Sequence, residues 1–184
     1  MAMEICGIDE AGRGPIAGPM VFAGVVLLKE IEGITDSKKL SPKKREELFE
    51  IILQNSINHI VWIYPDEIDE KGLSFCIKKA LNEIKRNIKA KKYLFDGNSS
   101  FGVEGIETVI KGDLKIKEIG AASILAKVSR DRYMMEIDSK YPQYNFKKHK
   151  GYITKEHVEL IKKHGFCEIH RKSYRLKELQ PTLF

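Results

Sequence analysis

The sequence predicts a single-domain α/β fold, and three observations support this. Short apolar runs rich in β-branched residues alternate with longer amphipathic segments, as strands alternate with helices in α/β proteins. The 184 residues suit one domain and can bury a sizeable core. Hydrophobic residues make up 42% and charged residues 32%, as in globular proteins, and no repeat or linker divides the chain.

The N-terminal half predicts three strands and one helix. Residues 3–9 form a strand-like run that the glycines at 12 and 14 end. Residues 20–28 are continuously apolar, which is typical of a strand buried on both faces. Ser41 and Pro42 are the N-cap and first-turn residues of a helix. A third strand follows at 57–64.

The C-terminal half predicts further helices around two short strands. Residues 73–89 form a basic amphipathic helix, and the strand at 93–95 stops at Asp96 and Gly97. Another short strand at 107–110 precedes a long helix over 119–139. Thr154 is the predicted N-cap of one more helix.

Cysteine content and hydropathy indicate the compartment. The three cysteines are odd in number, far apart and without metal-binding spacing, which favours a reducing environment. The longest uncharged run, residues 14–28, is too short for a membrane helix, and the N-terminus is acidic where a signal peptide would be basic. We therefore predict a soluble, cytoplasmic protein with no membrane partner.

The positive charge is concentrated at the C-terminus. The net charge is +6, yet residues 1–140 are balanced, and residues 141–184 hold 10 basic and 4 acidic residues. This asymmetry favours an anionic partner such as nucleic acid, and a solvated basic face is the alternative. We expect the segment at about 141–176 to bind substrate and about 177–184 to form a tail.

Four acidic residues lie at the ends of apolar strands close to glycine: Asp9, Glu10, Asp96 and Asp113. Functional sites of open α/β sheets gather at strand ends. Adjacent residues of a strand point to opposite faces, so Asp9 and Glu10 reach one cation only where the pleat breaks. Carboxylates without paired His or Cys favour Mg²⁺ or Mn²⁺, and ordinary turn or cap acids are the alternative.

Two further segments are candidates for nucleic-acid contact. The loop Gly12-Arg13-Gly14 leaves room for a sugar or phosphate close to its amides, or is simply a tight turn. Residues 147–152 place lysines beside Tyr152, where lysine neutralises phosphate and tyrosine stacks, unless this is a solvated loop.

Taken together, the motifs resemble the ribonuclease HII family. Seven segments match in order over about residues 4–175: GIDEAGRGP at 7–15, DSKKL at 36–40, FDGN at 95–98, KGD at 111–113, AASILAKVSRDR at 121–132, HKGY at 149–152 and HRKSY at 170–174. The resemblance implies a ribonuclease H-like fold with a mixed central sheet flanked by helices. It also implies cleavage of RNA in RNA–DNA hybrids and on the 5′ side of single ribonucleotides in duplex DNA, as in ribonucleotide removal and primer processing.

Carried over by motif, the resemblance assigns roles to individual residues. The four metal-binding carboxylates fall on Asp9, Glu10, Asp96 and Asp113, for two Mg²⁺ or Mn²⁺ ions during catalysis. The loop that senses the 2′-hydroxyl falls on Gly12, Arg13 and Gly14, and the tyrosine that packs on the neighbouring deoxyribose falls on Tyr152. By the same resemblance, Lys38, His149 and Lys150 lie near the nucleic-acid backbone.

The expected chemistry is two-metal hydrolysis that leaves 5′-phosphate and 3′-hydroxyl ends. A non-catalytic binding module is one alternative, although four unmetallated carboxylates would repel phosphate. Another metal-dependent nuclease of the same fold is the second alternative, against which the glycine loop and Tyr152 argue.

The last five residues, Gln180 to Phe184, resemble the Q-x-x-L-F motif by which bacterial proteins bind the sliding clamp. Leu183 and Phe184 at a chain end suit insertion into an apolar pocket, with Gln180 bonding at its rim. Pro181 departs from the leucine common in that motif. The alternative is that these side chains pack on the domain itself.

Overall fold

The molecule is built on a five-stranded mixed sheet with strand order β3-β2-β1-β4-β5. The computed structural model describes residues 4–179, with only the backbone at Glu178. β1 (Ile5–Ala11), β2 (Met20–Leu27) and β3 (Ser56–Ile63) form an antiparallel meander. β4 (Lys92–Asp96) and β5 (Ile106–Val109) then add parallel to β1 on its other side. This parallel half of the sheet brings the carboxyl ends of β1 and β4 together.

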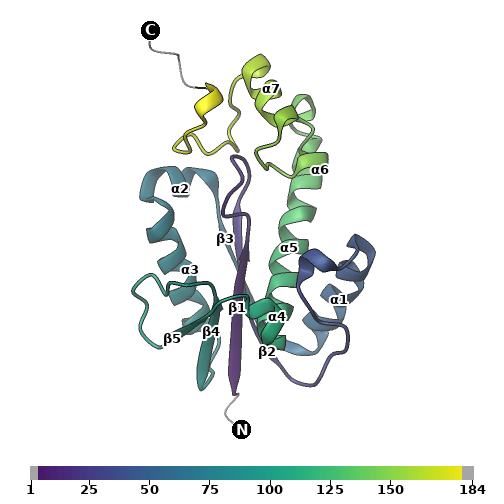
Figure 1. Cartoon of the computed structure of the whole chain (residues 1–184), viewed down its shortest axis with the longest axis vertical. Helices are drawn as coiled ribbons and strands as arrows, with labels where there is room; N and C mark the ends of the chain where they lie inside the picture. Colours follow the sequence, from purple (N-terminus) through teal and green to yellow (C-terminus); the bar gives the residue numbers. More distant parts are fainter. Residues whose placement is uncertain (1–3, 180–184) are drawn as a thin grey trace.

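Helices cover both faces of the sheet, as Figure 1 shows in a view along the sheet's edge. On one face lie α2 (Pro65–Lys71) and α3 (Leu73–Asn87). The other face carries α1 (Pro42–Gln54) and the long α5 (Lys117–Asp138), which follows the short α4 (Gly112–Lys115). A 3₁₀ turn, η1 (Ser37–Lys39), joins β2 to α1.

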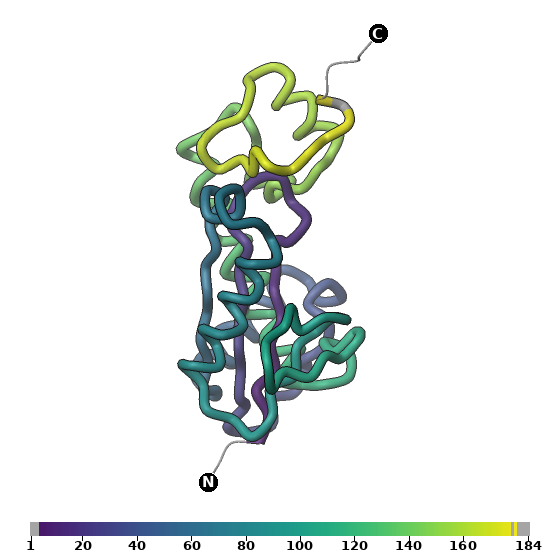
Figure 2. Tube along the Cα trace, turned by 90° about the vertical axis from the view of Figure 1, so that its left-hand side faces the viewer, coloured from purple at the N-terminus to yellow at the C-terminus, as the bar shows by residue number. Residues whose placement is uncertain are grey.

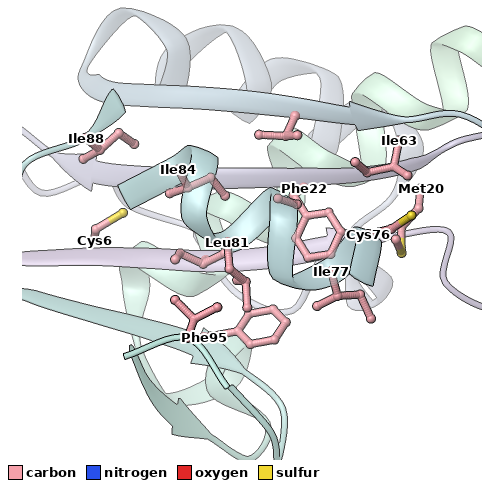
Figure 3. Close-up of a cluster of buried hydrophobic side chains, with 14 of the residues drawn as sticks. Cys6, Met20, Phe22, Ile63, Cys76, Ile77, Leu81, Ile84, Ile88 and Phe95 are labelled. Carbon is pink, nitrogen blue, oxygen red and sulfur yellow. The ribbon is translucent and has the colours of Figure 1, made fainter. Parts of the chain in front are cut away.

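Each face of the sheet has its own apolar core. Between the sheet and α3, the strand residues Phe22 and Phe95 pack against Ile77 and Leu81 (Figure 3), and Ile8 of β1 belongs to the same core. The opposite core joins β2 to α1 and the alanine-rich part of α5. A Cβ on Gly7 would lie 2.2 Å from the Glu118 carbonyl carbon, so β1 needs glycine where the start of α5 approaches.

The structure confirms the helix starts read from the capping residues. Ser41 Oγ accepts the Lys44 amide at 3.2 Å, and Thr154 Oγ1 accepts the His157 amide at 3.1 Å. Other details differ from expectation. Residues 65–71 form the unexpected helix α2, because Pro65 occupies its first turn and Gly72 ends it with φ 82°. The first strand continues to Ala11, two residues beyond its predicted end.

The basic C-terminal segment folds as a cap over the end of the sheet (Figures 1 and 2). It consists of η2 (Pro142–Tyr144), α6 (Phe146–His149) and α7 (Lys155–His164), and η3 (Lys177–Leu179) follows it. Two small cores hold it, one around Tyr144 and Phe146 and one around Ile16 and Ile161. Among residues 4–179, no helix has the length and apolar character needed to cross a bilayer.

Candidate active site

Parallel pairing of β1 with β4 places two acidic residues side by side. Ile8 pairs with Phe95, so Asp9 and Asp96 are the next residues on adjacent strands. Asp9 is 9% exposed, and its Oδ1 accepts the Glu10 amide at 2.8 Å. The predicted meeting of strand-end carboxylates is therefore present at β1 and β4.

Asp113 joins them from the first turn of α4. The amides of Gly112 and Asp113 donate to Asp96 Oδ1 and Oδ2 at 3.3 and 3.4 Å. Lys111, before this turn, has a left-handed conformation with φ 54°, which directs the chain from β5 back towards the strand ends. The α4 turn thus fixes the Asp96 carboxylate and delivers Asp113 beside it.

The three aspartates form one compact oxygen cluster. One carboxylate oxygen from each of Asp9, Asp96 and Asp113 lies within 4.8 Å of the others. Burial raises the pKa of Asp9 well above its usual value, and the charges of Glu10 and Asp96 add to this. Burial and Asp96 raise the pKa of Asp113 to about 6. Such concentrated, poorly solvated negative charge fits a divalent cation, for which carboxylate oxygens are the preferred ligands.

Glu10 lies at the edge of this cluster, because the side chains of β1 keep alternating between the two faces through Glu10. β1 runs on to Ala11, with Asp9 on the α5 side and Glu10 on the face of Ile8. Glu10 forms an ion pair with Arg13 at 2.6 Å, and its other oxygen, Oε2, is buried without a hydrogen-bond partner among residues 4–179. Burial raises the pKa of Glu10, and the charge of Arg13 partly offsets this.

All four carboxylates line one cavity of about 560 Å³. The sequence-predicted residues Gly12, Arg13, Lys38 and Tyr152 also line it, whereas Gly14 and Lys150 do not. Sequence reasoning missed Ser123 and Lys127, which face the cavity from α5. Ser123 Oγ lies 2.7 Å from Ser37 Oγ, which ties η1 to α5. Helical spacing in AASILAKVSRDR was the available signal, since Ser123 and Lys127 are four residues apart.

Asp36 is a further acidic group near the cluster. Its charge and a side-chain hydrogen bond both contribute to the raised pKa of Asp113. Its own Oδ1 accepts the Lys38 amide at 2.9 Å, which caps η1. The DSKKL segment therefore brings Lys38 to the cavity with Asp36 next to the aspartate cluster.

Tyr152 is held at the cavity mouth, next to the glycine loop. Tyr152 is 41% exposed, and the charged groups of Arg130 and Lys127 lie 5.4 and 5.8 Å from the centre of its ring. The amides of Ile16 and Ala17 donate to the Gly151 carbonyl at 3.0 and 3.3 Å. The cap thereby joins Tyr152 to the segment that follows Gly14.

The structure places the side chain of His149 inside the cap. Its ring is buried at 7% exposure; Nε2 donates to the Tyr144 carbonyl at 2.6 Å, and Nδ1 accepts the Gly151 amide at 3.1 Å. Both ring nitrogens are used inside the cap, so this side chain shapes the loop. The Lys150 amine turns back to the Lys147 carbonyl. Gln180, Leu183 and Phe184 lie outside the described residues.

Comparison with known proteins decides the family. The family model for ribonuclease HII matches residues 6–177. The ribonuclease HII of Campylobacter hominis is 58% identical over 183 residues, covering 98% of this chain and 99% of that protein. This chain belongs to the ribonuclease HII family. The ribonuclease HII of Sulfurovum sp. is 55% identical over 181 residues, which cover 98% of this chain and 96% of the relative.

Solved structures of ribonuclease HII and its relatives share the fold. The chain resembles ribonuclease HII in its PCNA complex from Archaeoglobus fulgidus, with a TM-score of 0.82, 28% identity and 98% coverage of both chains. Ribonuclease H2 of Pyrococcus horikoshii gives a TM-score of 0.76 and 31% identity, with 94% coverage of both. The predicted ribonuclease H-like fold with a mixed sheet is confirmed.

Membership of the ribonuclease HII family also confirms the enzyme class. Members hydrolyse RNA in RNA–DNA hybrids, so the prediction of a ribonuclease H is confirmed. The family depends on divalent metal, and the cluster of Asp9, Asp96 and Asp113 is the candidate site in this chain.

Proposed function

We propose that this chain is an endonuclease that cuts the RNA strand of RNA–DNA hybrids and the 5′ side of single ribonucleotides in duplex DNA. In the cell it would remove ribonucleotides from DNA and process RNA primers. The observation that carries the proposal is the aspartate cluster, which lies in the same cavity as Arg13, Lys38 and Tyr152. A non-catalytic binding module would have no use for buried carboxylates that repel phosphate.

Asp9, Asp96 and Asp113 would hold Mg²⁺ or Mn²⁺, with Glu10 as a further ligand once it leaves Arg13. Two bound ions would activate a water molecule and stabilise the leaving 3′-oxygen, which gives 5′-phosphate and 3′-hydroxyl ends. The protein itself holds the carboxylate ligands in position. The Gly112 and Asp113 amides orient the Asp96 carboxylate, and burial keeps Asp9 from turning to solvent.

Recognition of the ribonucleotide would fall to the glycine loop and Tyr152. The 2′-hydroxyl distinguishes RNA from DNA, and backbone amides of Gly12, Arg13 and Gly14 are suitable donors to it. The exposed Tyr152 ring would pack on the neighbouring deoxyribose. Lys38 in the cavity, and Lys150 on the cap, would neutralise phosphates.

We also propose that residues 1–184 act as one catalytic domain, in which the cap at about 141–176 grips the duplex. The short tail of about 177–184 would bind the bacterial sliding clamp through Gln180, Leu183 and Phe184. The solved complex of the Archaeoglobus relative with PCNA supports a clamp partner, because that relative covers 98% of this chain.

A cleavage panel tests the proposed substrate. Wild type, Arg13→Ala and Tyr152→Ala are each assayed on a long hybrid, on duplex DNA with one ribonucleotide, and on all-DNA duplex. We expect wild type to cut the first two only, and both variants to lose more activity on the lone ribonucleotide, since it offers a single 2′-hydroxyl. Cleavage of all-DNA duplex by wild type would contradict the proposal.

A further inference from the structure

The HRKSY segment contains a charged side chain that the proposed chemistry does not use. Arg171 is completely buried, with 0% of its surface exposed. Within the described residues, all hydrogen bonds of its guanidinium go to neutral oxygens of the chain. A buried charge without a carboxylate is costly, and good hydrogen bonds must offset that cost.

The oxygens that Arg171 contacts belong mainly to the glycine loop. Nη2 donates to the Gly12 carbonyl at 2.5 Å, and Nη1 donates to the Arg13 carbonyl at 2.9 Å. Nε donates to the Gly18 carbonyl at 3.0 Å. One planar guanidinium thus holds three carbonyls, which an ammonium group could not match in geometry.

Tyr174 reinforces the same contact. Its hydroxyl donates to the Arg13 carbonyl at 2.6 Å and accepts from Arg171 Nη1 at 3.0 Å. The Arg171 amide also donates to the Ile16 carbonyl at 2.7 Å, so the backbone of the segment follows the loop.

These contacts determine where the loop's amides point. In a trans peptide the carbonyl and the following N–H are antiparallel, and the described chain has no cis peptide bond. With the Gly12 and Arg13 carbonyls held by Arg171, the N–H groups of Arg13 and Gly14 point away from it. Neither N–H donates to another group of residues 4–179. Gly12 permits this turn with φ 87°.

We propose that Arg171 and Tyr174 are positioning residues that present the Arg13 and Gly14 amides to the ribonucleotide. A carbonyl that accepts a charge-assisted hydrogen bond polarises its peptide, which makes the attached N–H a stronger donor. Arg171 therefore both aims the two amides and strengthens them. This inference rests on the proposed function, because it assigns the contacts behind its 2′-hydroxyl recognition.

The test compares two conservative variants of the full-length protein. Tyr174→Phe removes one hydroxyl behind the loop and keeps the ring. Tyr144→Phe is the matched control, since it removes the hydroxyl that donates to the Gly165 carbonyl at 2.7 Å inside the cap. Binding to duplex DNA with and without one ribonucleotide is measured by fluorescence anisotropy in EDTA, together with Tm and with kcat/KM on both proposed substrates in Mg²⁺.

We expect Tyr174→Phe to lower the ratio of the two affinities by about threefold to tenfold, the effect of one lost hydrogen bond. The ratio of kcat/KM between the lone ribonucleotide and the long hybrid should fall likewise. Tyr144→Phe should lower Tm without changing either ratio. Arg171→Lys, which keeps the charge but loses the planar donor set, should lower both ratios further.

The outcomes separate this inference from the function on which it rests. If wild type cleaves no ribonucleotide-containing duplex, the proposed function fails and the inference with it. If wild type cleaves while Tyr174→Phe keeps both ratios, the inference alone is overturned. Equal changes in Tyr174→Phe and Tyr144→Phe would likewise overturn it, because they would reflect cap stability only.

Discussion

Two active-site residues, Asp9 and Asp113, destabilise the metal-free fold. The raised pKa values of Asp9 and Asp113 show that the folded protein holds their negative charges unfavourably. A group whose pKa is raised on folding stabilises the fold below its unfolded pKa and loses that contribution as pH rises through its folded pKa. At neutral pH the metal-free cluster therefore lowers the free energy of unfolding, and a bound cation would raise it again.

Asp9→Asn should nearly abolish cleavage while raising the Tm of the metal-free protein. The reason is that asparagine keeps the shape of the side chain and removes a negative charge that the neighbouring carboxylates repel. In a protein of this size, each kcal/mol of stability gained raises Tm by about 2–4 °C. Thermal denaturation in EDTA and in Mn²⁺ measures this, and Mn²⁺ should stabilise wild type more than the variant. Near-normal turnover by Asp9→Asn would contradict the metal assignment.

Among the structural elements, the cap depends on three neutral histidines. The rings of His149 and His157 stack with centres 4.1 Å apart, and His157 Nε2 lies 3.0 Å from His170 Nε2. His157 Nδ1 donates to the Tyr152 carbonyl at 2.9 Å, and His170 Nδ1 accepts the Cys167 amide at 2.9 Å. His170 Nε2 must then donate to His157, so a second proton on either ring would face a donor.

Acid should therefore loosen the cap. Burial lowers the pKa of His157 to about 4 and that of His170 to about 3. Because the unfolded histidines take up protons first, near pH 6.5, their contribution to the free energy of unfolding falls as pH drops from about 6.5 to 3. The aspartate cluster changes the free energy of unfolding in the opposite direction as pH falls. Urea unfolding is therefore measured across this pH range in the Asp9→Asn, Asp113→Asn double variant, which removes that contribution. NMR titration midpoints of these two rings near pH 6.5 would contradict the account.

The capping residues show how much local structure the sequence predicts. The N-cap side chains of Ser41 and Thr154 bond to amides only three residues further on, so the pattern that predicts each helix start is local. Both helices begin where expected. The face of Glu10 was not predictable in this way, because it depends on how far β1 pairs with β2 beyond the end of β4. Whether a strand stops at a glycine is decided by its neighbours, not by the glycine.

On the scale of the whole molecule, the site is assembled from segments far apart in the chain. The Arg130 guanidinium donates to the carbonyls of Ala17, Pro19 and Lys150 at 2.8–2.9 Å, which joins the segment before β2, helix α5 and the cap. Motif order in the sequence identified the family, but it could not show that Arg130 and Arg171 join these segments. Buried arginines bound to backbone carbonyls have no short-range sequence signal.

The tail is the part of the molecule whose proposed role is separable from catalysis. Deleting residues 180–184 should leave cleavage of short oligonucleotides unchanged and abolish binding to the clamp of the same organism. Surface plasmon resonance on immobilised clamp, with Tm as the control, measures this. A large fall in Tm on deletion, with no clamp binding by the intact chain, would favour packing of the tail on the domain instead.

The most direct test of the central claim is the chemistry of the cut ends. Duplex DNA with one ribonucleotide is incubated with wild type and Asp9→Asn, in Mg²⁺, Mn²⁺ or EDTA, and the products are identified by mass spectrometry. Our account predicts a single cut on the 5′ side of the ribonucleotide, by wild type with metal only, leaving 3′-hydroxyl and 5′-phosphate ends. A 2′,3′-cyclic phosphate end, or cleavage that persists in EDTA, would contradict it.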